Sequence, residues 1–190
     1  MKSILVCLLV LGGVLQGQEN QREKKKLICG LELEKHDRGP EGTPGYRLKV
    51  TLTYNWFRQK MVRGDKGLQL MVVKKDGEEV ATELWGADGT REAGLSDFHM
   101  LRSGGGVIFN FGMRAYEKEG KWFLSWTDAL GNYHGCKLKT LEGIKLVMKY
   151  ANEANEDFKL KLSETSTLEV KKEEIWSGEV RSEAVELPSK

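Results

Sequence analysis

His134 and Cys136 are the residues whose types and spacing come nearest to a catalytic pair, and Asp128 lies close to them in the sequence. A Cys–His nucleophile needs an imidazole within hydrogen-bond reach of a thiolate that stays reduced. Two residues apart on a strand, these side chains would share a face but stand roughly 6–7 Å apart at the backbone, which is long for that contact. The spacing therefore favours a structural cysteine, and we predict no catalytic residue here.

The histidines and glycines form no recognisable site for a metal or a cofactor. His36, His99 and His134 lack the i, i+2 or i, i+4 spacing of a local metal site, although Asp97 and His99 would share one side of a strand. Gly104–Gly106 is not followed by the Lys-Ser/Thr of a phosphate-binding loop. We therefore predict no metal and no cofactor. The carboxylate pair of a glycoside hydrolase is assembled by the fold, so a polysaccharide-active hydrolase stays open as an alternative.

The tryptophans offer the clearest chemistry for binding, because exposed aromatic rings stack on the faces of sugars. Trp56, Trp122 and Trp126 are in register with Leu and Val, which predicts that they lie in a core. Trp85 lies at the end of an expected strand, and Trp176 lies near the end of the chain. These two are the candidate ligand-binding residues, with core packing as the open alternative for Trp85.

Residues 1–17 have the three parts of a cleavable signal peptide. Met1-Lys2 is a positive start, Ile4–Leu15 is an apolar run, and Gln16–Gln18 is a polar exit. The apolar run is shorter than the roughly 20 helical residues that cross a bilayer. The sequence predicts a secreted or periplasmic protein that begins near residue 18, with no transmembrane segment after cleavage.

The charges of the chain are nearly balanced, with 30 Lys and Arg against 28 Asp and Glu. A nucleic-acid partner calls for a concentrated basic face, so this balance argues against one. The one basic run, residues 22–26, belongs to the new N-terminal segment 18–26, which we interpret as a solvated basic leader.

Loss of the signal peptide removes Cys7 and leaves Cys29 and Cys136. Each of the two alternates with apolar residues, so each is expected to face a core. Two inward-facing cysteines in an exported protein predict one disulfide bond between them. Two buried thiols that never meet are the alternative.

Nearly every apolar cluster after residue 26 has a period of two, which is typical of half-buried β-strands. The alternating stretches are Leu27–Leu33, Leu48–Trp56, Leu68–Val72, Val80–Leu84, Val107–Met113, Trp122–Trp126, Ile144–Tyr150, Phe158–Leu162 and Leu168–Val170. Asp76-Gly77 predicts a tight hairpin turn, and Leu95–Arg102 is the stretch expected to form a helical turn. The pattern predicts an all-β protein, with an antiparallel sandwich or open barrel over residues 27–115 and a disordered tail over 177–190.

A series of strands and turns follows Gly120. Trp126-Thr127-Asp128-Ala129-Leu130-Gly131-Asn132 precedes the alternating run Ile144–Lys149, a polar turn at Asn152–Asn155 and the closing strand Phe158–Ser163. This order resembles the Sla-type homology domain, a small SH3-like barrel named for an endocytic adaptor and found in exported bacterial proteins. The resemblance covers residues 126–170 and implies an SH3-like β domain over residues 120–172, with a binding role and no chemistry. It implies one small core of Leu138, Ile144, Leu146, Met148, Phe158, Leu160 and Leu162, with Lys145, Lys149, Lys159 and Lys161 facing solvent.

These observations predict an exported, non-enzymatic binding or envelope-associated protein. Its partner would be an unknown protein, peptide or glycan and not a nucleic acid. The alternatives are a polysaccharide-active hydrolase and a carbohydrate-binding module. The hydrolase would need two carboxylates about 5–10 Å apart, and these would lie beside exposed tryptophan.

Overall fold

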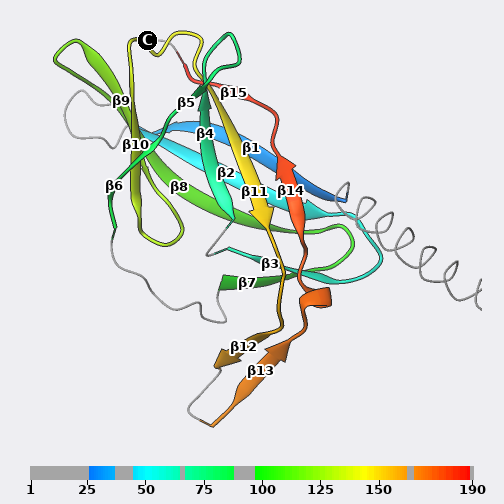
Figure 1. Cartoon of the computed structure of the whole chain (residues 1–190). Helices are drawn as coiled ribbons and strands as arrows, with labels where there is room; N and C mark the ends of the chain where they lie inside the picture. Colours follow the sequence, from blue (N-terminus) through cyan, green and yellow to red (C-terminus); the bar gives the residue numbers. More distant parts are fainter. Residues whose placement is uncertain (1–25, 37–44, 65–66, 88–96, 162–164, 189–190) are drawn as a thin grey trace, which may run out of the picture.

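The computed structural model describes residues 26–36, 45–64, 67–87, 97–161 and 165–188, and there the chain consists mainly of antiparallel β-strands (Figure 1). The prediction of an all-β fold is confirmed. The predicted signal peptide and all of the basic leader except Lys26 lie outside the described residues. Within the described ranges, none of the helical structure has the length and apolar character needed to cross a bilayer.

The larger of the two main sheets has six strands in the order β1-β2-β8-β9-β10-β6. Their bounds are β1 (Leu27–His36), β2 (Gly45–Tyr54), β6 (Glu83–Gly86), β8 (Gly105–Lys118), β9 (Lys121–Thr127) and β10 (Tyr133–Leu138). All neighbouring strands in this sheet are antiparallel. The long strands β1, β2 and β8 curl across the body of the molecule (Figure 1).

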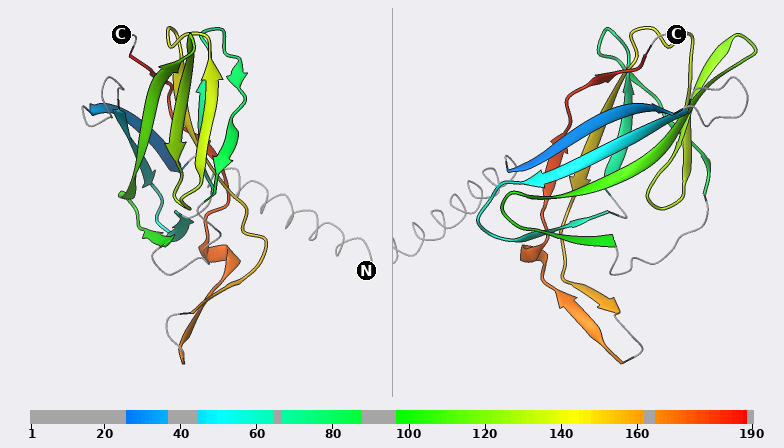
Figure 2. Two further views of the ribbon diagram at one scale, coloured as in Figure 1. Left: turned by 90° about the vertical axis from the view of Figure 1, so that its left-hand side faces the viewer. Right: turned by 180° about the vertical axis from the view of Figure 1, so that it is seen from behind.

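The second main sheet has the order β14-β11-β4-β5, and β15 also pairs with β11. Its bounds are β4 (Leu68–Val73), β5 (Glu79–Val80), β11 (Lys145–Asn152), β14 (Gly178–Arg181) and β15 (Val185–Glu186). Two small sheets pair β3 (Lys60–Arg63) with β7 (Phe98–Leu101) and β12 (Phe158–Lys161) with β13 (Thr167–Val170), and a short 3-10 helix spans Lys172–Glu174. The β12–β13 hairpin projects from the body (Figure 2).

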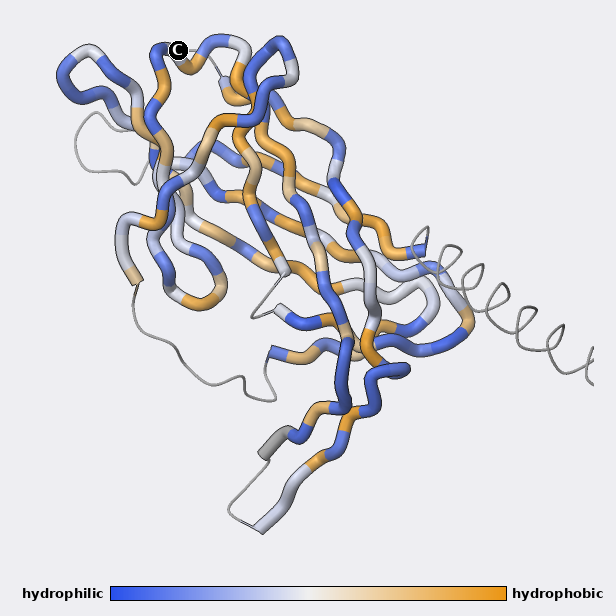
Figure 3. Tube along the Cα trace, viewed as in Figure 1, coloured by the Kyte–Doolittle hydropathy of each residue, from blue (hydrophilic) through white to orange (hydrophobic). Residues whose placement is uncertain are grey.

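The main core lies between the two larger sheets, because both contribute alternate apolar residues to it. The buried set along β2 is Tyr46, Leu48, Val50, Leu52 and Tyr54, and β11 adds Leu146, Met148 and Tyr150. We call the core side of the six-stranded sheet its inner face and the opposite side its outer face. A slip of one residue would turn these apolar side chains to the outer face, so the alternation fixes the register. Hydrophobic residues are concentrated along the strands of this body and are sparser on β12 and β13 (Figure 3).

Two tight turns follow from local sequence chemistry. The predicted hairpin at Asp76-Gly77 is confirmed and joins β4 to β5. Gly77 has a φ of 90°, which L side chains rarely adopt, and Asp76 Oδ1 accepts a 3.0 Å hydrogen bond from the backbone N–H of Glu78. Glu119 and Gly120 both have positive φ, as a two-residue hairpin turn requires, and join β8 to β9.

The strands of residues 120–172 do not follow the closed path expected of an SH3-like barrel. β9 pairs with β8 as well as with β10, and β10 pairs with β6 on its other side. β11 pairs with β4 and β14. These pairings run across the boundary placed between residues 115 and 120. Local alternation shows which face of a strand is apolar, but it does not determine which strand is the hydrogen-bonded neighbour. The observed pairing could therefore not be predicted from the sequence.

The apolar side chains that were expected to share one small core divide between two clusters. Leu138, Ile144, Leu146 and Met148 lie in the main core. Phe158 packs, half-buried, against a smaller cluster of Met61, Phe98, Val170 and Ile175. The side chains of Leu160, Lys161 and Leu162 lie outside the described part of the structure. Lys159 is exposed, whereas Lys145 and Lys149 are half-buried.

The predicted disordered tail at 177–190 is wrong for most of its length. β14 and β15 both pair with β11, and Leu187 is 1% exposed in the main core. The backbone N–H of Leu187 donates a 2.9 Å hydrogen bond to the carbonyl of Ile144. Val180 and Val185 pack on the core while Glu179 and Arg181 point to solvent. Strands this short carry too few apolar residues to show a period in the sequence.

The predicted Cys29–Cys136 disulfide is absent, because both residues are free thiols buried in the main core. Cys29 lies on β1 and Cys136 on β10, and three strands separate β1 from β10 in the sheet. Successive strands are about 4.8 Å apart, whereas bridged Cα atoms lie within about 7 Å. The Cys29 thiol contacts the Met148 carbonyl at 3.7 Å instead. Of the helical turn predicted within Leu95–Arg102, Asp97 has 3-10 helical conformation and residues 95 and 96 lie outside the described part of the chain, whereas Phe98–Leu101 forms β7.

Candidate ligand-binding site

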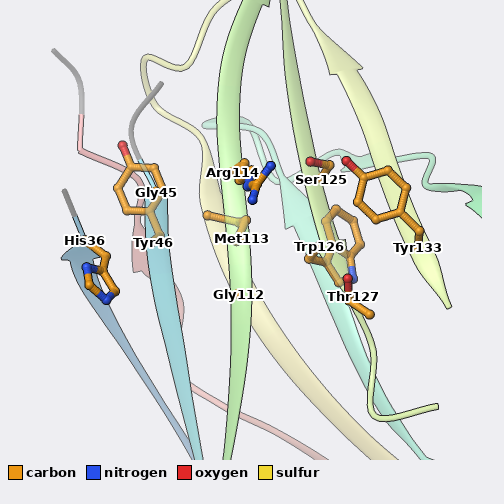
Figure 4. A pocket seen from close by; sticks show the side chains of 10 residues that line it. All are labelled: His36, Gly45, Tyr46, Gly112, Met113, Arg114, Ser125, Trp126, Thr127 and Tyr133. Atoms are coloured by element: carbon orange, nitrogen blue, oxygen red, sulfur yellow. The ribbon is translucent and has the colours of Figure 1, made fainter. Parts of the chain in front are cut away.

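A pocket of about 480 Å³ opens on the outer face where β1, β2, β8, β9 and β10 come together (Figure 4). Its lining is His36, Gly45, Tyr46, Gly112, Met113, Arg114, Ser125, Trp126, Thr127 and Tyr133. Antiparallel pairing sets Gly45 opposite Arg114 and Arg114 opposite Ser125, while Thr127 stands opposite Tyr133. These partners share the outer face because residues opposite each other in a sheet point the same way. Tyr46, Met113 and Trp126 alternate with them and are buried.

Glycine makes the pocket hollow. Gly112 lies on the outer face between the core residues Phe111 and Met113. A Cβ built at Gly112 would have no heavy atom within 4 Å, so the space above it is open. Gly45, on the neighbouring strand, likewise has no side chain to cover the sheet.

Arg114 and Ser125 are the polar side chains that could hold a ligand in this pocket. Ser125 is 1% exposed, and its Oγ has no hydrogen-bond partner among the described residues. A buried hydroxyl without a partner is uncommon and costs roughly 1–3 kcal/mol. Arg114 is exposed, and no ion pair or hydrogen bond joins it to the described side chains. In Figure 4 the two side chains lie on adjacent strands, with the Tyr133 ring beyond Ser125.

An aromatic cluster extends the site across the outer face toward the sheet edge. Tyr116 stacks on Phe123 with ring centroids 5.3 Å apart. Trp85 on the edge strand β6 contacts Phe123 at 6.2 Å and Tyr133 at 5.9 Å between ring centroids. All four rings are at least partly accessible, and Tyr133 is shared with the pocket. We call Trp85, Tyr116, Phe123 and Tyr133 the aromatic cluster.

Gly135 allows Trp85 to lie against the sheet. A Cβ at Gly135 would come within 2.3 Å of two ring carbons of Trp85, so a larger residue there would displace the ring. The Trp85 indole N–H donates a 3.1 Å hydrogen bond to the carboxylate of Glu83, which fixes the ring along its strand. The ring is therefore held in one orientation by the sheet below and the carboxylate beside it.

The turn between β9 and β10 positions Tyr133 at the rim of the pocket. Asp128 Oδ1 accepts 2.9 Å hydrogen bonds from the backbone N–H groups of Leu130 and Asn132. Its Oδ2 accepts from the Asn132 side-chain amide at 3.0 Å and lies 2.9 Å from His134 Nε2. Burial alone would raise the pKa of Asp128, but these hydrogen bonds outweigh it and hold the pKa below its usual value.

The two tryptophans singled out from the sequence have different environments. Trp85 is half-buried in the aromatic cluster, beside the pocket. Trp176 is 0% exposed and packs against Tyr150 in the main core, so it offers no surface to a ligand. Its backbone N–H is bonded to the carbonyl of Met61, which anchors the segment after the 3-10 helix inside the molecule. Position near the chain end was a poor guide because the C-terminal strands return to the core.

The Cys–His arrangement has no catalytic geometry. Burial raises the pKa of the Cys136 thiol to about 11, so the thiolate is scarce near neutral pH. His134 is engaged by Asp128 and stacks on Trp126. His99 packs edge-on against the Phe109 ring. Across the described residues, no three His, Cys, Asp or Glu side chains gather in a way that could hold a metal ion.

A second pocket, of about 780 Å³, lies between the β4–β5 hairpin and the connection from β10 to β11. Its rim carries lysines and glutamates together, among them the ion pair of Lys74 with Glu78. Because charges of both signs surround it, this pocket indicates no particular ligand chemistry.

Arg114, Ser125 and Gly112 were not predicted from the sequence as site residues. The available signal was the outer-face pattern itself: Gly112 and Arg114 fall on the polar positions of a strand whose other positions are apolar. That signal could not show that Ser125 would be buried without a partner, because burial depends on how the strands are packed and not on the alternation along one strand. Comparisons of the chain with protein-family models, with curated proteins and with solved structures find no match.

Proposed function

We propose that this protein is a non-enzymatic, exported binding protein whose ligand docks in the outer-face pocket and on the aromatic cluster beside it. The observation that carries the proposal is the buried, unpartnered hydroxyl of Ser125 next to the exposed guanidinium of Arg114. Both groups are hydrogen-bond donors, and a ligand with acceptor atoms would satisfy them. Pockets with a few convergent polar groups among aromatic and apolar walls are the usual form of a small-ligand site.

Export is supported by the three-part signal pattern of residues 1–17. A secreted or periplasmic protein meets glycans and peptides of the cell envelope, and either could supply the ligand. The binding role rests on the pocket and not on the resemblance to the Sla-type domain, since β11 pairs outside that segment.

The aromatic cluster favours a carbohydrate over a peptide, as in a carbohydrate-binding module. Trp85 and Tyr133 present ring surface beside a polar pocket, and ring faces pack well on the C–H groups of sugars. The described lining of the pocket contains no Asp or Glu. A glycoside hydrolase uses two carboxylates at the scissile bond, so the pocket supports binding better than cleavage.

The test is a glycan and peptide array probed with the mature chain, residues 18–190, and with two matched variants. Gly112→Val puts a branched side chain into the open floor of the pocket, where its Cβ meets nothing. Gly30→Val is the control on the same outer face, because the nearest atoms to a Cβ there lie at an ordinary 3.8 Å.

We expect the array to show glycan binding that Gly112→Val removes and Gly30→Val retains. Binding that is unaffected by Gly112→Val would place the ligand elsewhere and overturn the proposed site. Release of new reducing ends from a bound polysaccharide would show the hydrolase instead.

A further inference from the structure

We propose that the ligand is an acidic glycan, with the carboxylate of a uronic acid held by Arg114 and Ser125 and a neighbouring sugar packed on the aromatic cluster. This inference rests on the proposed function and names the ligand class of that same site. It follows from three features of the outer face: the isolation of Arg114, the orphaned hydroxyl of Ser125 and the path from them to Trp85.

Arg114 differs from the two cations that share its side of the sheet on the adjacent strand β2. There, Lys49 pairs with Glu32 at 2.9 Å and Arg47 approaches Glu34 at 4.0 Å. The two residues directly opposite Arg114 are Gly45 and Ser125, and neither carries a charge.

The described lining of the pocket has Arg114 and His36 as its basic groups and no carboxylate. The local field therefore favours an anion. A guanidinium presents parallel N–H groups that match a planar carboxylate in a bidentate pair.

Ser125 supplies the second contact. Its hydroxyl is buried at the position directly across from Arg114, so one carboxylate could accept from both groups. The hydroxyl groups of Thr127 and Tyr133 lie along the same wall and suit the remaining sugar hydroxyls. A carboxylate bound here would satisfy a donor that the protein leaves unsatisfied, which is a stronger reason for the site than charge alone.

The position of the aromatic cluster indicates that a bound glycan would run across the strands, from Arg114 toward Trp85. Ser125 stands between Arg114 and Gly135 across β8, β9 and β10, and Trp85 covers Gly135. From β8 to β6 there are three strand spacings, roughly 14 Å in all, which exceeds the width of a single sugar ring. A chain of sugars running across the strands would place its acidic unit at Arg114 and the next unit against Tyr133 and Trp85.

The experiment compares acidic oligosaccharides with their own neutral forms. Oligomers of galacturonate, of mannuronate and of a glucuronate-containing repeat are titrated calorimetrically into the mature chain. The same oligomers are tested after reduction of their carboxyl groups to primary alcohols. The protein variants are Arg114→Gln, Arg114→Lys and Ser125→Ala, with Arg102→Gln as a control at an exposed arginine outside the pocket.

We expect at least one acidic oligomer to bind about tenfold or more tightly than its reduced form, and Arg114→Gln to abolish that difference. Arg114→Lys should retain part of the affinity, because lysine keeps the positive charge. It should not retain all of it, because lysine lacks the parallel N–H groups that bind a carboxylate in a bidentate pair. Ser125→Ala should weaken binding, and Arg102→Gln should leave it unchanged.

Equal binding of acidic and reduced oligomers, sensitive to Gly112→Val, would overturn the acidic-glycan inference and leave the proposed binding site standing. Binding of acidic oligomers that Arg102→Gln weakens as much as Arg114→Gln would show a non-specific charge effect and would also overturn it. If no acidic oligomer binds, but Gly112→Val still abolishes the binding of a ligand found on the array, the acidic-glycan inference is overturned and the proposed binding site is supported.

Discussion

Ser125 and Ser182 are both buried serines, yet their hydroxyl groups are satisfied differently. Ser182 Oγ accepts a 3.0 Å hydrogen bond from the backbone N–H of Met148 and donates one of 2.7 Å to the Glu183 carbonyl. Ser125 Oγ has no such partner among the described residues. An unsatisfied buried hydroxyl costs stability, and a ligand bound as proposed would offset that cost at Ser125.

The two serines make a matched pair for a stability test. Ser182→Ala should lower the free energy of unfolding by about 1–3 kcal/mol, because it leaves the Met148 N–H without its acceptor. Ser125→Ala should change it by less than about 0.5 kcal/mol or raise it, since no bond within the protein is lost. Urea denaturation of both variants measures the difference. An equal loss in both would mean that the Ser125 hydroxyl is already satisfied.

The buried thiols make a second prediction at the scale of residues. Burial raises the pKa of the Cys29 and Cys136 thiols from near 9 to about 11. A raised pKa in the folded state contributes stability that is fully present below pH 9 and is lost as the pH rises toward 11. Thiol labelling of the unfolded, unreduced mature chain should find both cysteines free. Labelling of the native chain at pH 8 should be slow, and rapid native labelling would contradict their burial.

Turns and strand alternation are the elements that could be predicted from the sequence, because both depend on neighbouring residues. Asp76-Gly77 specifies its hairpin through a positive φ and a side-chain hydrogen bond. Alternation along Leu48–Tyr54 specifies a strand with a buried face. Strand partners depend on residues far apart in the chain, so the pairing of β11 with β4 and β14 was not predictable.

The same distinction applies to the candidate site. Trp85 could be found from its type and its place at a strand end. The isolation of Arg114 depends on which residues stand opposite it, namely Gly45 and Ser125. The burial of Trp176 depends on the return of the C-terminal strands to the core, which the local sequence does not show.

The β9–β10 turn should be the pH-sensitive element near the pocket. Asp128 has a lowered pKa in the folded state, so its hydrogen bonds contribute stability above its unfolded pKa near 4, and this is lost as the pH falls through its folded pKa. Asp128→Ala should cost about 1–3 kcal/mol at pH 7. When both proteins are denatured at a series of pH values from 7 to 3, the difference between their free energies of unfolding should become smaller. If that difference did not change with pH, the stability lost in Asp128→Ala would come from packing and not from the charged carboxylate.

The C-terminal strands should be essential to the fold. Leu187→Ala should lower the free energy of unfolding by about 2–5 kcal/mol, because the side chain is fully enclosed in the main core. Glu186→Ala, at the exposed neighbouring position, should be near neutral. Thermal denaturation separates the two. Equal midpoints for both variants would contradict the docking of β15 on β11.

The whole molecule is a curled antiparallel sandwich in which the inner face of the six-stranded sheet provides the core and its outer face carries the proposed binding surface. Gly112 lies on the outer face, where a Cβ would meet no heavy atom within 4 Å. A substitution there fills the pocket without disturbing the core. Valine favours strands more than glycine does, so Gly112→Val should fold at least as stably as the wild type. A loss of binding in this variant can therefore be assigned to the pocket itself.

The most direct test is the affinity of wild type, Gly112→Val and Gly30→Val for the tightest-binding glycan, measured by calorimetry alongside their melting temperatures. We predict a loss of about tenfold or more in Gly112→Val, which is about 1.4 kcal/mol or more, with an unchanged or higher melting temperature. Gly30→Val should bind as the wild type does. Wild-type affinity in Gly112→Val would contradict the assignment of ligand binding to the outer face at Arg114 and Ser125.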